Sequence, residues 1–136
     1  MKIHLIVSEK EKRIPHYHRQ ATNEYAKRLS RYASVRIIYR SSMKKSAKES
    51  SSSKAFVFRV SSQGSYLSSE ELAAMIKNLA GSGHANIHFC IGAAPDREDK
   101  SISISPLTMS PSLETVIMLE QIYRAFRIIR GEPYHK

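Results

Sequence analysis

The stretch Ile87-His88-Phe89-Cys90-Ile91, followed by Gly92-Ala93-Ala94-Pro95-Asp96, says most about how this chain folds. Its first part is apolar and rich in strand-forming residues, and its second part consists of small and turn-forming residues. This pattern is typical of a buried strand that ends in a loop. Small residues let a backbone approach a ligand closely. Because ligands of parallel α/β sheets bind beyond the carboxyl ends of the strands, we expect a binding site near this loop and near the loops after Val60 and Ser105.

Strand-like and helix-like segments alternate along the rest of the chain. Runs of β-branched and aromatic residues predict strands at 2–8, 35–39, 55–60, 87–91 and 101–105. Apolar periodicity predicts helices at 15–31, 70–80 and 111–130. This alternation predicts an α/β fold, with a mainly parallel sheet flanked by helices, in a single domain over residues 1–136.

The ends and faces of these helices can also be predicted. Ser69 is placed as an N-cap, and Gly81 and Gly131 are placed as helix ends. In the first helix, a buried face is expected where apolar residues recur every four positions, at Tyr17, Ala21, Tyr25 and Leu29. The last helix has a broader apolar face than one small sheet needs, which predicts a homodimer through this helix.

Positive charge is concentrated in the first part of the chain. Residues 1–54 hold 14 Lys and Arg against 4 Asp and Glu, whereas residues 55–136 hold 8 of each, and the net charge is +10. Such a surface attracts polyanions, so nucleic acid is the favoured partner. We expect RNA contacts from a basic, serine-rich loop at 41–54, and from the first helix; the residues are Lys44, Lys45, Lys48 and Arg19.

Composition argues against several other classes of protein. Apolar residues make up 41% and charged residues 25%, which is typical of a globular domain. A single cysteine, Cys90, rules out an internal disulfide, and its apolar strand predicts a core thiol. No apolar run is long enough for a membrane span, so we expect a cytoplasmic protein without a membrane partner. The acidic residues at 96–99 and the histidines at 16 and 18 are interpreted as polar surface, and no metal is predicted.

The C-terminal third carries a family resemblance. The segments Ser103-Ile104-Ser105-Pro106-Leu107-Thr108-Met109, Glu120-Gln121-Ile122-Tyr123-Arg124-Ala125 and Pro133-Tyr134-His135 resemble the ribosomal RNA large subunit methyltransferase H family. That family belongs to the trefoil-knotted SPOUT methyltransferases. The N-terminus, Gly64 and 72–74 also fall in register, so the resemblance covers nearly the whole chain.

The resemblance implies a SPOUT-type fold with a C-terminal trefoil knot and a homodimeric enzyme. The implied reaction is methyl transfer from S-adenosylmethionine to N3 of a pseudouridine in 23S rRNA of the large ribosomal subunit. It implies cofactor contacts at Val60, Gly92, Ile104, Ser105, Pro106, Leu107, Thr108 and Met109. It also implies catalytic roles for Tyr134 and His135, which reach the active site across the dimer. Here His135 would be the base, and Arg124 would neutralise charge on the substrate.

Two departures from the family pattern support a second hypothesis. Ala93 stands where the family usually has a second glycine, and Gly92 to Lys100 leaves nine residues before the next strand. A parallel crossover through a packed helix needs about a dozen, so that helix is expected to be shortened or lost. The alternative is a non-catalytic RNA- or ribosome-binding protein on the same fold with a degraded cofactor pocket. A third hypothesis is an unrelated small α/β protein with a basic arm.

Overall fold

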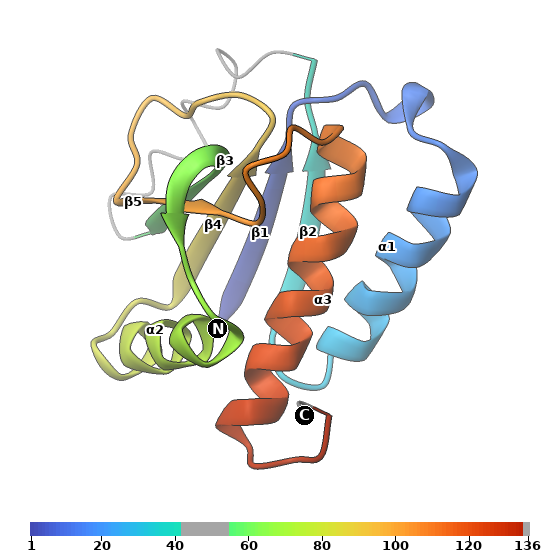
Figure 1. Ribbon diagram of the computed structural model, residues 1–136. Coiled ribbons are helices and arrows are strands. Elements are labelled where there is room, and N and C mark those ends of the chain that lie inside the picture. Colours follow the sequence, from blue (N-terminus) through green and yellow to red (C-terminus); the bar gives the residue numbers. More distant parts are fainter. Residues whose placement is uncertain (42–54, 135–136) are drawn as a thin grey trace.

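The computed structural model describes residues 1–41 and 55–134. Its centre is a five-stranded sheet in the order β2-β1-β4-β3-β5, with every strand parallel to its neighbours (Figure 1). The strands are Lys2–Val7 (β1), Ser34–Tyr39 (β2), Phe56–Tyr66 (β3), Asn86–Ile91 (β4) and Lys100–Ser103 (β5). The predicted α/β fold with a parallel sheet is therefore confirmed, and each predicted strand is present.

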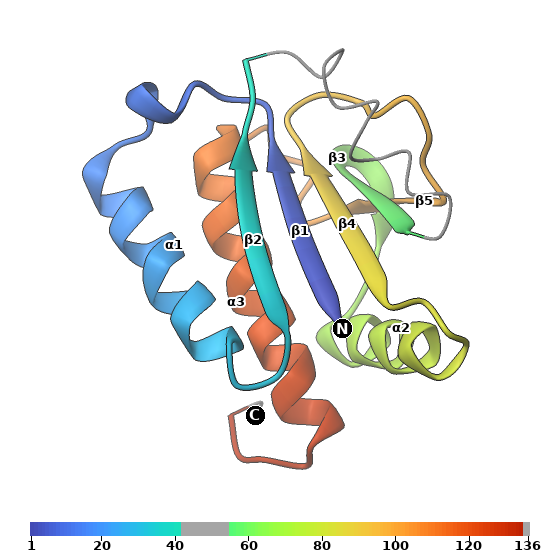
Figure 2. The ribbon, with the colours of Figure 1, turned by 180° about the vertical axis from the view of Figure 1, so that it is seen from behind.

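Three α-helices and one short 3-10 helix, η1 (Glu11–Arg13), accompany the sheet. The first and last α-helices, α1 (His16–Leu29) and α3 (Pro111–Ile129), lie side by side on one face (Figure 1). The helix α2 (Ser69–Gly81) lies near the end where the strands begin and also contacts α3. The opposite face of the sheet, seen in Figure 2, carries none of the described helices. None of the helices in the described part of the chain is both long and apolar enough to cross a bilayer.

Alternation along the strands separates two apolar clusters. Side chains such as Leu5 and Phe89 point to the helix-covered face, where Phe58 and Phe89 stack with ring centroids 4.9 Å apart. These side chains are fully buried, and each such burial contributes about 1.5–3 kcal/mol to folding. Ile6, Val57 and Cys90 form a smaller buried cluster on the opposite face. The core therefore holds the carboxyl ends of the strands in a fixed arrangement.

The caps of α2 correct two predictions. The N-cap is Ser68, one residue before the predicted Ser69, because the Ser68 side chain accepts a hydrogen bond from the Glu71 backbone and the Glu71 carboxylate accepts one from Ser68. Gly81 is itself the last residue of α2 and does not take the left-handed conformation of a glycine that follows a helix. The left-handed position is Gly83, with φ of +88°. The Gly131 prediction is confirmed, since Gly131 has φ of +65° just after α3.

The predicted buried face of α1 is confirmed at Leu29, which is fully buried, and is wrong at Tyr17. Tyr17 is 68% exposed, whereas Thr22 is 2% exposed. The face that packs inward includes His18, whose Nδ1 lies 2.8 Å from the Ser112 hydroxyl at the start of α3. This face includes a hydrogen-bonded histidine and a buried threonine. Because these residues are polar, apolar periodicity alone does not predict the face.

The strand β3 is longer than predicted and turns around β5. The expected strand at 55–60 continues to Tyr66, and Val60 and Ser65 both pair with Ile102. The intervening residues curl past the backbone of β5. At Gly64 a Cβ atom would lie only 2.5 Å from the Ile102 carbonyl carbon, so this close approach requires glycine.

We expect Gly64→Ala to destabilise the protein by about 3 kcal/mol, because the added methyl meets backbone that cannot move freely. Gly81→Ala is the matched control, since no atom lies within 4 Å of a Cβ there. It should be neutral or stabilise by about 0.5–1 kcal/mol. Urea unfolding followed by circular dichroism measures both. Equal unfolding midpoints for the two variants would contradict this account of Gly64.

Candidate functional site

A pocket of about 250 Å³ lies at the carboxyl end of the sheet. The middle of β3, residues 59–62, forms one wall, Gly92 after β4 contributes a second, and the segment Leu107–Met109 with the first turn of α3 forms the third. This is where ligands of parallel α/β sheets bind. The volume is below the roughly 300–1,000 Å³ usual for small-molecule sites, so the pocket holds part of a nucleoside-sized ligand.

The structure brings together five of the eight expected cofactor residues. The pocket is lined by Val60, Gly92, Leu107, Thr108 and Met109. Ile104 instead lines a separate groove of about 140 Å³ between β5, α2 and α3. Ser105 and Pro106 line neither; the Ser105 hydroxyl accepts a hydrogen bond from the Leu107 backbone at 3.1 Å and so shapes the segment.

The sequence analysis missed several lining residues. Pocket residues without a prediction are Arg59, Ser61, Ser62, Pro111 and Glu114. Ser61 and Ser62 were not named individually, although a binding site was expected near the loop after Val60; they belong to β3, which continues to Tyr66. Arg59 and Glu114 are charged residues on a predicted strand and a predicted helix. The sequence offered only their positions: Arg59 lies near the end of the predicted strand, and Glu114 lies in the first turn of the predicted helix.

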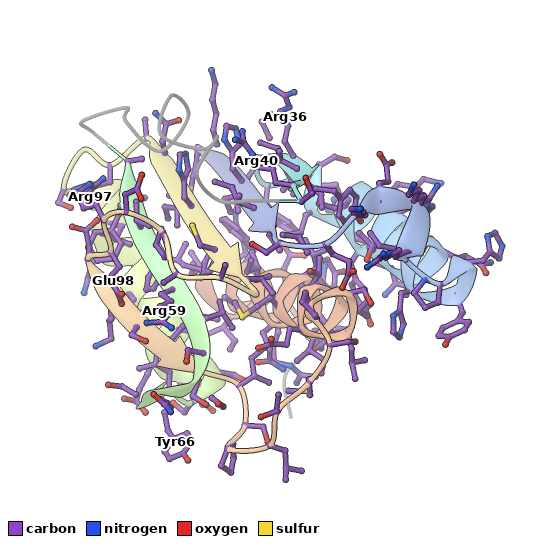
Figure 3. The ribbon with its side chains drawn as sticks, turned by 90° about the horizontal axis from the view of Figure 1, so that it is seen from above. Arg36, Arg40, Arg59, Tyr66, Arg97 and Glu98 are labelled. Atoms are coloured by element: carbon purple, nitrogen blue, oxygen red, sulfur yellow. The ribbon has the colours of Figure 1, made fainter. Side chains whose placement is uncertain are left out.

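The acidic residues after β4 form ion pairs. Glu98 lies beside Arg59, with charged atoms 3.7 Å apart, and Figure 3 shows the two side chains next to each other along β3. Asp99 accepts hydrogen bonds at 2.8 Å from both Arg97 and the Val57 backbone. Within residues 1–41 and 55–134, no group of three or more His, Cys, Asp or Glu could hold a metal ion. The interpretation of this segment as a polar turn agrees with these contacts.

The loop after β4 contributes Gly92 to the pocket despite its departures from the family pattern. Gly92 has φ of +101°, and a Cβ there would lie 2.9 Å from the Ser8 Cβ and 3.2 Å from Pro111. Ala93 does not have a positive φ, so it needs no glycine. As expected, residues 92–99 reach β5 without a helix. The shortened connection therefore coexists with a formed pocket.

The C-terminal tail folds back onto α3. The Tyr134 hydroxyl donates a hydrogen bond to Glu120 at 3.0 Å, and the Arg124 guanidinium bonds the same carboxylate oxygen at 3.0 Å. The Arg124 guanidinium also lies 4.9 Å from the centre of the Tyr134 ring, which packs edge-on against Tyr123. These contacts hold Tyr134 against α3. His135 lies outside the described residues.

The tyrosine hydroxyl in this cluster is not a base. Burial, with hydrogen bonds to Tyr25 and Glu120, raises the pKa of Tyr134 well above its ordinary value. At neutral pH the side chain keeps its proton and acts as a donor.

The buried thiol of Cys90 is also unreactive, because burial raises its pKa to about 11.

Within one chain, the tail and the pocket lie at opposite ends of α3. Pro111 lines the pocket, and Arg124 lies 13 residues further along the helix. At 1.5 Å per residue this separation is about 20 Å. Tyr134 is held beside Arg124 and, of the described residues, is not among those that line the pocket of its own chain.

Of the four residues expected to contact RNA, the structure describes Arg19. Lys44, Lys45 and Lys48 lie outside the described residues. Arg19 is half-buried on α1 and donates a hydrogen bond to the Glu11 carbonyl at 2.7 Å, which links α1 to η1. Figure 3 places Arg36 and Arg40 on the side of the sheet away from α3.

Comparison with known proteins gives consistent results. Residues 1–135 match the family model described as a predicted SPOUT methyltransferase. The ribosomal RNA large subunit methyltransferase H of Lactobacillus helveticus is 39% identical, over 88% of this chain and 91% of the relative. The protein of the same name from Alkaliphilus oremlandii is 36% identical with the same coverage. Ribosomal RNA large subunit methyltransferase H 1 of a Thermoanaerobacter species is 37% identical over 91% and 92%.

Proposed function

The chain belongs to the SPOUT methyltransferase family and is an RNA methyltransferase, and we propose that it methylates N3 of a pseudouridine in the 23S rRNA of the large ribosomal subunit, using S-adenosylmethionine. The observation that carries this proposal is the pocket at the carboxyl end of the sheet. It is built from Val60, Gly92 and Leu107–Met109, three segments that are far apart in the sequence.

The residues of the pocket fit this cofactor. Val60, Leu107 and Met109 offer apolar surface, and Thr108 offers a hydroxyl. Gly92 keeps the wall free of a side chain. A half-buried carboxylate, Glu114, also lines the pocket, and it suits a ligand with positive charge. When bound, S-adenosylmethionine supplies an electrophilic methyl group on a positively charged sulfur.

The tail residues are proposed to do the proton chemistry. N3 of the uracil ring carries a proton, which a base must accept before nitrogen can bond to carbon. We assign this role to His135, whose ordinary pKa near 6.5 suits proton acceptance at neutral pH. Tyr134 keeps its proton and positions the ring. Arg124, oriented by Glu120, stabilises the negative charge that develops on the base.

A homodimer brings the tail to the pocket. The outward side of α3 carries Leu113, Ile117 and Ile128 with Glu120 and Arg124, all half-buried in the single chain. Antiparallel packing of two α3 helices about a twofold axis would place the tail of one chain beside the pocket of the other. The 20 Å along the helix would then be spanned by the partner.

A trefoil knot through the segment 104–110 is also proposed. The close packing of Gly92 against Ser8 and Pro111 is compatible with it.

The expected solution state is a dimer of twice 15.4 kDa at micromolar concentration. Sedimentation equilibrium measures this mass directly. A monomer at that concentration would reject the interface and, with it, a site completed by the partner.

The basic loop is expected to bind the rRNA backbone. Replacing Lys44, Lys45 and Lys48 together by glutamine should weaken ribosome binding. It should also reduce the slope of log K against log salt by about 2–3, because each phosphate contact releases counterions. Lys77→Gln on the exposed surface of α2 is the control and should leave the slope nearly unchanged. An unchanged slope in the triple variant would move the docking surface elsewhere, first to Arg19 and its helix.

Two measurements on the purified protein test the function. Calorimetric titration with S-adenosylmethionine should show binding, and incubation with ribosomes and radiolabelled cofactor should label 23S rRNA at a pseudouridine. Ribosome binding without any cofactor binding would instead favour the hypothesis of a non-catalytic protein with a degraded pocket. Labelling of a base other than pseudouridine would keep the enzyme class and reject the substrate.

A further inference from the structure

The carboxylate of Glu114 is in an unusual position for a charged group. It is half-buried in the first turn of α3 and lines the pocket. Burial raises its pKa, and among the described residues no cation or hydrogen-bond donor contacts it. Taking a carboxylate out of water without a partner costs free energy. A pocket that retains such a group is suited to a cationic part of its ligand.

A guanidinium also lines this pocket, from a different element. Arg59, near the end of the first part of β3, lines it together with Val60 and the serines that follow. Its only described ion pair is with Glu98, at 3.7 Å. Both side chains are more than one-third exposed, Arg59 at 39% and Glu98 at 35%. An arginine has five N–H donors, so this distant pair leaves donors for a ligand anion.

The two residues are the charged members of the pocket lining, one of each sign. The α-amino acid end of S-adenosylmethionine carries one ammonium and one carboxylate. Resting on the proposed function, we infer that Glu114 binds the ammonium and Arg59 binds the carboxylate of the cofactor's amino acid end. Val60, Gly92 and Leu107–Met109 then face the nucleoside end.

A simpler explanation of Glu114 makes a different prediction. A carboxylate in the first turn of a helix is favoured by the partial positive charge of that end. If this were its whole role, Glu114→Gln would change stability but would not change the preference for one ligand over another. Ligand selectivity therefore separates the two explanations.

The test uses calorimetric binding with three probes: S-adenosylmethionine, S-adenosylhomocysteine and 5′-methylthioadenosine, which lacks both charged groups of the amino acid end. Glu114→Gln and Arg59→Met should each bind the first two about 10–100-fold more weakly, the usual contribution of a hydrogen bond between charged groups. Binding of 5′-methylthioadenosine should change less than threefold. Arg97→Met is the matched control, because Arg97 pairs with Asp99 outside the pocket lining, and it should bind all three like the parent.

Decarboxylated S-adenosylmethionine assigns the two charges separately. The parent should prefer the complete cofactor, Arg59→Met should lose that preference, and Glu114→Gln should keep it. Equal losses of affinity for all probes would overturn the assignment. A loss of affinity in Glu114→Gln for S-adenosylmethionine alone would also overturn it, because this result would mean that Glu114 contacts the sulfonium. Parent protein that binds none of the adenosyl ligands would reject the cofactor itself. Parent binding with unaffected variants would reject only the two residues.

Discussion

Replacing His135 by alanine should lower methyl transfer to ribosomes by about 10²–10⁴-fold, the usual contribution of a general base. Tyr134 packs on Tyr123 and bonds Glu120, and neither contact uses the His135 side chain. Folding, dimerisation and cofactor binding should stay close to those of the parent. Initial rates with radiolabelled cofactor, together with calorimetry, measure both quantities. Full activity in His135→Ala would reject the base.

A mixed dimer tests whether the tail acts across the interface. His135→Ala and a pocket variant, Gly92→Ala, are each expected to be inactive alone. When the two are co-expressed with different tags and the heterodimer is isolated, one pocket is intact and faces the intact tail of its partner. About half of the parental activity should return. A silent heterodimer would show that tail and pocket act within one chain, which the separation of about 20 Å along α3 argues against.

Gly92→Ala should weaken cofactor binding at least tenfold. Gly92 has φ of +101°, and the added Cβ would lie 2.9 Å from the Ser8 Cβ and 3.2 Å from Pro111, itself a lining residue. Backbone strain contributes about 1–3 kcal/mol and the close contacts a similar amount. We expect a loss of about 3–4 kcal/mol in unfolding free energy and a loss of at least tenfold in cofactor affinity.

The control for this variant is Gly83→Ala. Gly83 also has a positive φ, +88°, but no atom lies within 4 Å of a Cβ there, and it follows α2 outside the pocket lining. It should cost about 1–2 kcal/mol of stability from strain alone and leave cofactor affinity unchanged. Equal affinities for the two variants would show that Gly92 does not shape the cofactor pocket.

Local sequence patterns predicted the elements well. The β-branched runs at 2–8 and 87–91 became β1 and β4, and the apolar stretch opened by Pro111 became α3. These segments are buried or strongly periodic, so their pattern is decided by residues close together in sequence. The short segment 92–99 was correctly expected to lack a full helix, because its length alone decides this.

Other features depended on contacts between distant residues. The inward face of α1 includes Thr22 and His18, which are polar yet packed or partnered. The continuation of β3 to Tyr66 depends on Ile102 pairing with it twice, and a strand that curls around another has no local signature. Choosing Ser68 over Ser69 as the N-cap depended on which serine Glu71 reaches.

The sequence by itself determined the strand–helix alternation, the concentration of positive charge before residue 55 and the motifs that indicate the family. These are properties of composition and short-range spacing, which exist before the chain folds. Only the tertiary structure decided which charged residues share a pocket. Arg59 and Glu114 are 55 positions apart and line one pocket because α3 begins beside the middle of β3. Packing and topology bring these two residues to the same pocket, so no local sequence pattern predicts that they are close together.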